Sequence, residues 1–294
     1  MRERFGLVSF RPGQQEAVMA ALQGRDVAVF WRAGAGKSLL YQMVALHTGL
    51  TVLVCSPCIS LMFDQVTNFN AMFADEPDGP KACYLGGDAA HGVEEAALAG
   101  EYSLVYLTPE KLTSRFLEGI RPLYEQCRIA LLAVDEADRI IAWGHDFRPA
   151  FRDIWFAREE YPALPIMALS ASATRDVQQD IQWQLQLRQP LVSCLPMDRD
   201  NLVMKCSMRS DPNKDLDRIA REIRADGGTA IVYVQTRRDA ISVARALRRR
   251  LGDIVREYHG AMVKDERDEA HLGFMVNQVR VVVATVAFGM GIDK

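Results

Sequence analysis

The stretch VFWRAGAGKSLLYQ, residues 29–42, joins an apolar run to a segment with helical spacing of apolar residues. Gly34 and Gly36 have no Cβ, so the backbone at these positions can curl tightly and come close to a phosphate group. Lys37 would reach the β- and γ-phosphates of a nucleotide, and Ser38 would bind Mg²⁺. The first amides of the helix would add further donors. The stretch therefore predicts a strand, a phosphate-binding loop and a helix in succession.

The match to such a loop is strong over AGAGKS, residues 33–38, which includes Ala35 between the two glycines. The full pattern G-x-x-x-x-G-K-[ST] is not met, because its first position is Trp31. The alternative is a glycine-rich turn with an incidental lysine. That alternative predicts no acidic partner elsewhere in the chain.

An acidic partner is present in ALLAVDEAD, residues 130–138, where an apolar run ends in Asp135 and Glu136. Asp135 would hold Mg²⁺ through water, and Glu136 would orient and deprotonate the attacking water. The alternative is that these acids only begin a helix, where they interact favourably with its dipole. Together with the loop, they favour a nucleotide-hydrolysing site that uses Lys37, Asp135 and Glu136.

Short apolar runs alternate along the chain with longer segments of helical spacing. This order predicts an α/β fold with parallel sheets whose strands are buried on both faces. The expected strands are 26–30, 51–55, 103–107, 129–134, 166–170, 230–234, 253–259 and 279–285, and the expected helices include 37–48, 111–126, 237–251 and 263–277. Ligands of such folds gather at the carboxyl ends of the strands.

An irregular stretch with two prolines, residues 188–201, separates the first set of strands from the second. We therefore expect a first lobe at 1–190, a linker at 191–206 and a second lobe at 207–294. With about three strands, the second lobe is expected to be incomplete.

The chain has 294 residues, of which 49% are apolar and 25% charged, and a net charge of −3. No apolar stretch reaches the roughly 18 residues of a membrane span, and the N-terminus lacks the apolar core of a signal peptide. Of six scattered cysteines, only Cys55 and Cys58 have C-x-x-C spacing, and no second pair completes a zinc site. We expect reduced thiols, an intracellular location, no zinc and no membrane partner.

Further segments along the chain carry distinctive short motifs. They are FRPGQQ (10–15), SPCISLMFDQV (56–66), YLTPEKL (106–112), DEAD (135–138), ALSASAT (168–174), IVYVQTRRDA (231–240), YHGAM (258–262) and VATVAFGMGIDK (283–294). With the phosphate loop, and in this order, they resemble the motifs of the RecQ-family DNA helicases of superfamily 2, and the resemblance runs from residue 5 to the last residue. It implies two RecA-like lobes and an ATP-dependent helicase of 3′-to-5′ polarity.

The nonapeptide WGHDFRPAF, residues 143–151, resembles the aromatic-rich loop that distinguishes RecQ proteins within superfamily 2. Trp143 and Phe147 offer faces on which unpaired bases can stack, worth about 1–3 kcal/mol each. His145 and Arg148 can meet the phosphate backbone. Because this loop starts a few residues after Glu136, it predicts DNA-stimulated ATP hydrolysis. The alternative is that its aromatic residues belong to the core.

The resemblance implies further site residues. Gln14 would pair with adenine through its amide, and Arg11 would lie against the base; the alternative for Gln14 is an exposed helix face. The motifs that contact DNA or couple the lobes include Ser60, Thr108, Ser172 and Thr174. The implied cofactors are ATP and Mg²⁺, and the implied partner is DNA, single-stranded or at a duplex junction. The implied location is the nucleus in a eukaryote and the cytoplasm in a bacterium.

Several residues depart from the family pattern. Leu7 stands in place of an aromatic residue, Ala33 in place of a threonine, and Trp31 could narrow the phosphate pocket. Asp138 puts a carboxylate where RecQ proteins have the histidine that links the ATP site to motif III. In YHGAM the glycine and alanine are swapped relative to the usual order.

Motif VI, which supplies the arginine finger in this family, would lie beyond Lys294. We therefore expect a chain that binds ATP and single-stranded DNA but hydrolyses ATP weakly. An RNA helicase, prompted by the letters D-E-A-D, and a non-catalytic ATP- and DNA-binding module are the alternatives.

The arginines of 237–250 could follow DNA phosphates, but a solvated helix face is the favoured interpretation. Ile241, Ala244, Leu247 and Leu251 would form the buried stripe of that helix.

Overall fold

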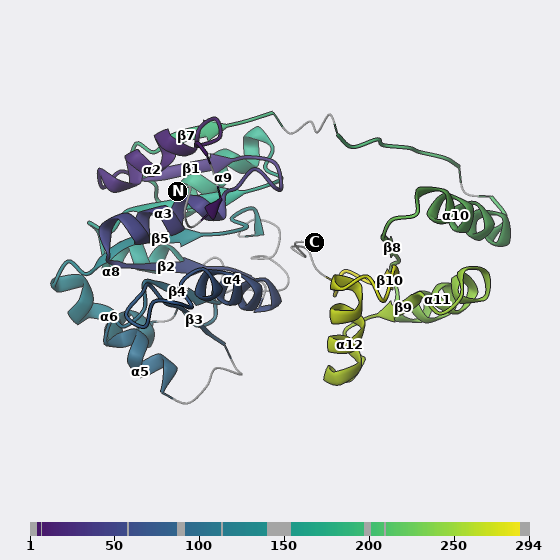
Figure 1. The fold of residues 1–294 in the computed structure, drawn as a ribbon. Helices are drawn as coiled ribbons and strands as arrows, with labels where there is room; N and C mark the ends of the chain where they lie inside the picture. Colours follow the sequence, from purple (N-terminus) through teal and green to yellow (C-terminus); the bar gives the residue numbers. More distant parts are fainter. Residues whose placement is uncertain are drawn as a thin grey trace. The chain divides into compact units, whose positions relative to one another are not determined.

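The computed structural model describes residues 5–6, 8–57, 59–86, 92–112, 114–139, 154–196, 201–208 and 210–288. The chain divides into two compact units, Met1–Asp200 and Asn201–Lys294 (Figure 1). Each unit is an α/β structure built on its own parallel sheet, which confirms the predicted fold class.

The first unit has a seven-stranded sheet in the order β3-β4-β2-β5-β6-β1-β7, and all its pairings are parallel. The strands are β1 (Val27–Phe30), β2 (Thr51–Cys55), β3 (Ala82–Leu85), β4 (Leu104–Leu107), β5 (Ile129–Val134), β6 (Ile166–Ser170) and β7 (Leu191–Cys194). The central strands read as unbroken apolar runs because both faces are covered. In β1, for example, Ala28 and Phe30 belong to one core cluster, and Val27 and Val29 to the other.

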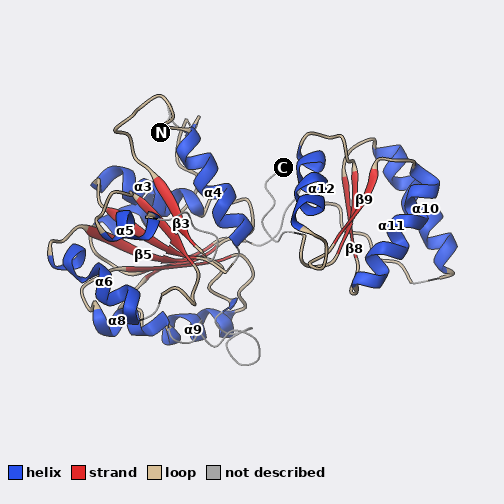
Figure 2. Ribbon diagram, turned by 90° about the horizontal axis from the view of Figure 1, so that it is seen from below, coloured by secondary structure: helices blue, strands red, loops and turns tan. Residues whose placement is uncertain are grey.

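Helices cover both faces of this sheet. The helices α2 (Gln14–Leu22), α3 (Ser38–Thr48) and α4 (Ile59–Ala71) pack on one core cluster, and α5 (Val93–Leu98), α6 (Ser114–Glu125), α8 (Phe156–Glu160) and α9 (Arg175–Gln184) pack on the other. Figure 2 shows α3 and α4 on one side of the strands and α6, α8 and α9 on the other. Right-handed crossovers of this kind bring the carboxyl ends of all the strands to one edge.

The five strands predicted for the first lobe are all present, within one residue at their ends. The two strands that were not predicted, β3 and β7, are the edge strands of the sheet. The prediction of a linker at 191–206 is wrong for its first four residues, because β7 pairs with β1 along its whole length. In β7 half-buried and exposed residues alternate, so the apolar signal is diluted.

The second unit is smaller and has a three-stranded parallel sheet in the order β8-β10-β9. Its elements are α10 (Pro212–Asp226), β8 (Ala230–Tyr233), α11 (Arg237–Leu251), β9 (Val255–Tyr258), α12 (Lys264–Met275) and β10 (Val281–Ala284). The core under α10 and α11 and the core under α12 lie on opposite faces of the sheet. The three predicted strands and the two predicted helices are present, whereas α10 was not predicted.

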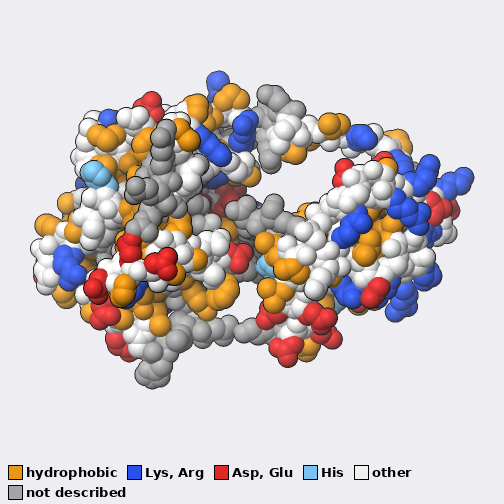
Figure 3. Space-filling view, viewed as in Figure 1, with side chains coloured by type: hydrophobic (Ala, Val, Ile, Leu, Met, Phe, Trp, Pro, Cys, Tyr) orange, Lys and Arg blue, Asp and Glu red, His pale blue; other side chains and the backbone are white. Residues whose placement is uncertain are grey.

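The predicted buried stripe of α11 is only partly correct. Ala244 and Leu247 are fully buried, but Ile241 is 39% exposed, and Ala240 is buried instead. Two arginines of this helix form ion pairs: Arg248 with Glu257 at 2.7 Å and Arg250 with Asp217 at 2.6 Å. Lys and Arg side chains are exposed over α10 and α11 (Figure 3), which agrees with a solvated face.

Among the described residues, every helix is too short or too polar to cross a membrane. Cys55 is a buried free thiol, and Cys58 lies outside the described residues.

Candidate nucleotide-binding site

Three loops that follow neighbouring strands meet at one edge of the first sheet. β1, β6 and β5 are adjacent, and after them come the glycine loop at 31–37, Ser170–Ser172 and the acidic turn at 135–138. The residues predicted to bind a nucleotide therefore lie at the carboxyl edge, where ligands of parallel sheets bind.

Both glycines of the loop have left-handed backbone conformations, with φ of +75° at Gly34 and +83° at Gly36. At Gly36 the close packing also excludes a side chain, because an added Cβ would lie 2.6 Å from the amide nitrogen of Gln14. The loop then passes directly into α3 at Ser38. These features hold the loop amides at a helix N-terminus, as phosphate binding requires.

Lys37 folds back over the loop, and its Nζ donates hydrogen bonds to the carbonyl oxygens of Trp31 at 3.1 Å and Arg32 at 3.4 Å. The carbonyl groups are neutral, so these hydrogen bonds leave the positive charge of the ammonium group available to attract an anion. The geometry therefore fits the phosphate-binding role predicted for Lys37.

The Trp31 side chain does not narrow the phosphate pocket as expected. Its indole is fully buried in the core that α2 and α3 cover, and its Nε1 donates a 3.0 Å hydrogen bond to Ser193 Oγ on β7. An added Cβ at Gly13, just before α2, would lie 2.8 Å from the ring. Val27, Val29 and Trp31 point to the same face, so strand alternation could have predicted this direction.

Gln14 is 1% exposed, which excludes the alternative of an exposed helix face. Its Oε1 accepts from the backbone N–H of Arg11 at 2.8 Å, and its Nε2 donates to the carbonyl oxygens of Gly36 at 3.1 Å and Ala35 at 3.4 Å. Arg11 Nη1 donates to the Gly34 carbonyl at 2.7 Å. Both residues therefore contact the phosphate loop.

Asp135 and Glu136 form a crowded acidic pair at the end of β5. Asp135 is 8% exposed, and its Oδ1 accepts from the Glu136 N–H at 3.0 Å. Burial raises the pKa of Asp135, and the nearby Lys37 charge opposes this rise. Burial, followed by the charges of Asp135 and Asp138, raises the pKa of Glu136 to about 7. The loop lysine thus acts electrostatically on both acids.

This arrangement fits a divalent cation. A buried carboxylate with acidic neighbours is unfavourable unless a cation compensates it. Mg²⁺ is bound by one or two protein groups, with water and substrate phosphates completing the shell. Ser38 and Asp135 would supply those groups. The described residues hold no cluster of three or more His, Cys, Asp or Glu side chains that would suggest a metal cage such as a zinc site.

Asp138 links the acidic turn to motif III, although it is not a histidine. Its Oδ1 accepts from Ser170 Oγ at 2.8 Å and its Oδ2 from Ser172 Oγ at 3.0 Å. Although an aspartate stands where the family has a histidine, two serine hydroxyl groups therefore connect this position to motif III. Ser170, which was not among the predicted site residues, is fully buried at the end of β6.

The other predicted site residues are only partly described. Thr108 follows β4 and is half-buried, and Thr174 is the N-cap of α9, where its side chain accepts from the Val177 N–H. Ser60 lies in the first turn of α4, but its side chain is outside the described part. Leu7 and the loop residues Trp143, His145, Phe147 and Arg148 also lie outside the described residues.

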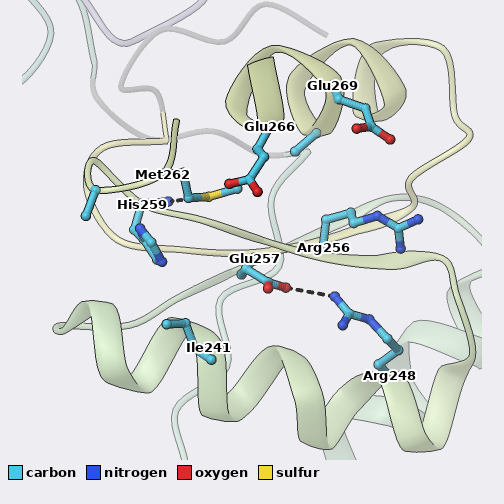
Figure 4. A pocket seen from close by; sticks show the side chains of 10 residues that line it. Ile241, Arg248, Arg256, Glu257, His259, Met262, Glu266 and Glu269 are labelled. Atoms are coloured by element: carbon cyan, nitrogen blue, oxygen red, sulfur yellow. Dashed lines mark hydrogen bonds and ion pairs between the residues drawn. The ribbon is translucent and has the colours of Figure 1, made fainter. Parts of the chain in front are cut away.

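A cavity of about 360 Å³ opens in the second unit, between α11, the edge strand β9 and α12 (Figure 4). The Arg248–Glu257 ion pair and the exposed Glu266 and Glu269 line it, and His259 of YHGAM closes one end. None of the residues predicted for the nucleotide site lines this cavity.

Sequence reasoning missed a pair of buried tyrosines next to the site, Tyr41 on α3 and Tyr106 on β4. Tyr41 lies in the segment of the phosphate loop and Tyr106 in YLTPEKL, but the site residues predicted from these two segments were others. Their contact depends on β4 lying beside β2 in the sheet, and no pattern within a single segment of the sequence predicts the order of the strands.

Comparison with known proteins gives consistent results along the chain. Residues 11–180 match the family model of the DEAD/DEAH box helicases, and residues 201–294 match that of the helicase conserved C-terminal domain. The ATP-dependent DNA helicase RecQ of Pasteurella multocida is 37% identical over 296 residues, which cover 99% of this chain and 45% of the relative. The RecQ helicase of Bacillus subtilis is 37% identical over 301 residues, covering 99% and 48%. The chain thus spans less than half the length of these relatives.

Two solved structures share the fold at low identity. The DNA-bound crystal structure of the DUF1998 helicase MrfA aligns with a TM-score of 0.78 at 17% identity, over 99% of this chain and 44% of that one. The helicase Lhr of Mycobacterium smegmatis, bound to single-stranded DNA and AMP-PNP, aligns with a TM-score of 0.73 at 20% identity, over 98% and 41%.

Proposed function

Since the chain belongs to the DEAD/DEAH box helicases and is the motor region of a RecQ-type protein, we propose that it couples ATP hydrolysis to 3′-to-5′ movement along DNA. ATP and Mg²⁺ would bind at the glycine loop, and single-stranded DNA or a strand–duplex junction would be the track. The names of the curated relatives as DNA helicases support DNA as the substrate.

One observation carries the proposal: the phosphate loop with Lys37 follows β1, the acidic turn with Asp135 and Glu136 follows β5, and both lie at the carboxyl edge of one sheet. Residues almost 100 positions apart are thus brought to one place, with a phosphate loop on one side and two acids on the other. This is the arrangement that phosphoryl transfer to water requires.

Each residue would then have a separate task. Lys37 leaves the carbonyl oxygens of the loop for the β- and γ-phosphates, and the amides around Gly34 and Gly36 bind phosphate oxygens. Ser38 and, through water, Asp135 would hold Mg²⁺, which would supply positive charge beside the phosphates. Glu136, with a pKa near neutrality, accepts the proton of the attacking water.

Two further tasks concern adenine and coupling. Gln14 and Arg11 would exchange their loop contacts for the base, which would favour ATP over GTP. Asp138, through Ser170 and Ser172, would pass the state of the acidic turn to motif III. Ser60, Thr108 and Thr174, with the loop at 143–148, would serve the DNA strand and its coupling to hydrolysis.

The test compares the chain with Lys37→Ala and Glu136→Gln. We expect the chain to bind a fluorescent ATP analogue with Mg²⁺, Lys37→Ala to lose that binding by about 100-fold, and Glu136→Gln to keep it. We expect single-stranded DNA to stimulate ATP hydrolysis in the unmodified chain but not in Glu136→Gln. Equal nucleotide affinity in the unmodified chain and in Lys37→Ala would refute the proposal. If RNA stimulated ATP hydrolysis as much as DNA or more, RNA would be the substrate of the motor.

A further inference from the structure

Polar side chains that are buried or half-buried form a group next to the nucleotide site in the first unit. Its members are Ser38, Tyr41 and Gln42 on α3, Tyr106 on β4 and Gln65 on α4. Tyr41 and Tyr106 are 0% and 1% exposed, and Gln42 is 8% exposed. Buried hydroxyl and amide groups are unfavourable unless they hydrogen bond, so the positions of these side chains depend on one another.

The group begins at the nucleotide site. Ser38 is the first residue of α3, Tyr41 lies about one turn further along the same helix, and the Tyr106 hydroxyl donates to the Tyr41 hydroxyl at 3.5 Å. The two rings meet edge to face, with centroids 6.1 Å apart. Burial, followed by the charges of Tyr106 and Asp135, raises the pKa of Tyr41, so its hydroxyl keeps its proton.

The group ends on the neighbouring helix. Gln42, the residue after Tyr41 on α3, donates from Nε2 to Gln65 Oε1 at 3.3 Å. The helix that begins at Ser38 thus contacts β4 through Tyr41 and the middle of α4 through Gln42. Distances of 3.3 and 3.5 Å are long for such hydrogen bonds, so a small shift of α3 would tighten or break them.

The two ends of this group belong to different parts of the proposed function. Ser38 is the metal-binding serine, whereas Gln65 stands in the segment SPCISLMFDQV and Tyr106 is two residues before Thr108. We propose that Tyr41 and Tyr106 are positioning residues that transmit the state of the nucleotide site to the DNA-contacting ends of α4 and β4. This inference rests on the proposed function. Because Ser38 and Tyr41 stand on the same first turns of α3, a small shift of this helix at the nucleotide site would change the contact of Tyr41 with Tyr106 on β4.

The experiment measures coupling through binding, without turnover. The affinity for a labelled oligothymidine of about 20 nucleotides is measured without nucleotide and with saturating Mg²⁺ and AMP-PNP, and the ratio of the two dissociation constants is the coupling factor. It is compared in the unmodified chain, Tyr41→Phe, Tyr106→Phe, the double variant and Tyr161→Phe. Tyr161 is the matched control, because it is a buried tyrosine whose hydroxyl donates to the Leu117 carbonyl in the opposite core cluster.

We expect a coupling factor of about 10 in the unmodified chain and in Tyr161→Phe, and a factor within about twofold of 1 in each of the other variants. The double variant should match the single variants, because the two hydroxyls form one contact. DNA affinity without nucleotide should change less than about twofold in all of them.

Three results would overturn the inference. The first is a coupling factor of 1 in the unmodified chain. The second is a full coupling factor in Tyr41→Phe and Tyr106→Phe. The third is a coupling factor in Tyr161→Phe that falls as far as in the other variants. If the unmodified chain binds nucleotide through Lys37 and binds DNA, these results leave the proposed function standing. If it binds neither, the proposed function fails and the inference fails with it.

Discussion

Glu136, the second residue after β5, is held in an uncommon backbone conformation, with φ of +51°. Left-handed backbone is unfavourable for a residue with a long side chain, and such strain concentrates at functional sites. The side chain is also held among like charges, since Asp135 and Asp138 raise its pKa further than burial alone. The backbone strain and the repulsion between like charges thus both fall on Glu136, the residue that would act as the base.

The raised pKa of Glu136 predicts a pH-dependent stability difference from Glu136→Gln. Its folded value of about 7 exceeds its ordinary value of 4.5, so the carboxyl is protonated in both states at low pH and ionises unfavourably in the fold as pH rises. The two chains should be equally stable below about pH 4.5, and Glu136→Gln should be more stable by about 3 kcal/mol at about pH 8. Urea unfolding at several pH values measures the difference. A constant difference across that range would contradict the raised pKa.

The two serines that bind Asp138 differ in burial, and their replacement should differ accordingly. Ser170→Ala should lower the free energy of unfolding by about 1–3 kcal/mol, because it removes the hydrogen bond between the buried Ser170 hydroxyl and Asp138. Ser172→Ala, at an exposed position, should cost less than about 0.5 kcal/mol. Equal losses for the two serines, measured by urea unfolding, would argue against this account.

At the scale of elements, Trp31 connects three of them: it directly follows β1, hydrogen bonds to β7 and packs beneath the start of α2. Trp31→Gly restores the first glycine of the phosphate-loop pattern, yet we expect no gain in nucleotide affinity. We expect a loss of about 3–5 kcal/mol in unfolding free energy, because a large core side chain is removed. Trp183→Ala, at a position 76% exposed on α9, is the control and should cost less than about 0.5 kcal/mol. Tighter ATP-analogue binding by Trp31→Gly would show that the indole does obstruct the loop.

The elements that could be predicted from the sequence are those with a strong local signal. β2, β5 and β6 are buried on both faces and form unbroken apolar runs, so even their ends were predicted correctly. β7 gives a weak signal, because it is a four-residue edge strand with exposed Val192 and Cys194. A short edge strand is recognised mainly by its neighbour, β1, which lies more than 160 positions earlier.

The same division applies to the candidate site. Lys37, Asp135 and Glu136 could be predicted because the chemistry of each is visible in a contiguous motif. The hydrogen bonds of Asp138 to Ser170, and of Tyr106 to Tyr41, could not, since they depend on which strands are neighbours. Motif reasoning therefore finds the groups that react, whereas the groups that position them require the sheet order.

At the scale of the whole molecule, the described nucleotide-site residues all lie in the first unit. Its sheet separates two core clusters, whereas the second unit has its own small sheet and its own cores. Folding stability gained from a ligand belongs to the cooperative unit that binds it. The two units should therefore respond differently to nucleotide.

We expect calorimetry to resolve two unfolding transitions, and AMP-PNP with Mg²⁺ to shift only one of them. At a ligand concentration of about 100 times the dissociation constant, the stabilisation is about 2.7 kcal/mol, which corresponds to a rise of roughly 5–10 °C for a unit of about 200 residues. Lys37→Ala should abolish the shift while leaving both transitions in place without nucleotide. A single transition that moves as a whole would mean that the units unfold together, and the nucleotide would then stabilise the second unit as much as the first.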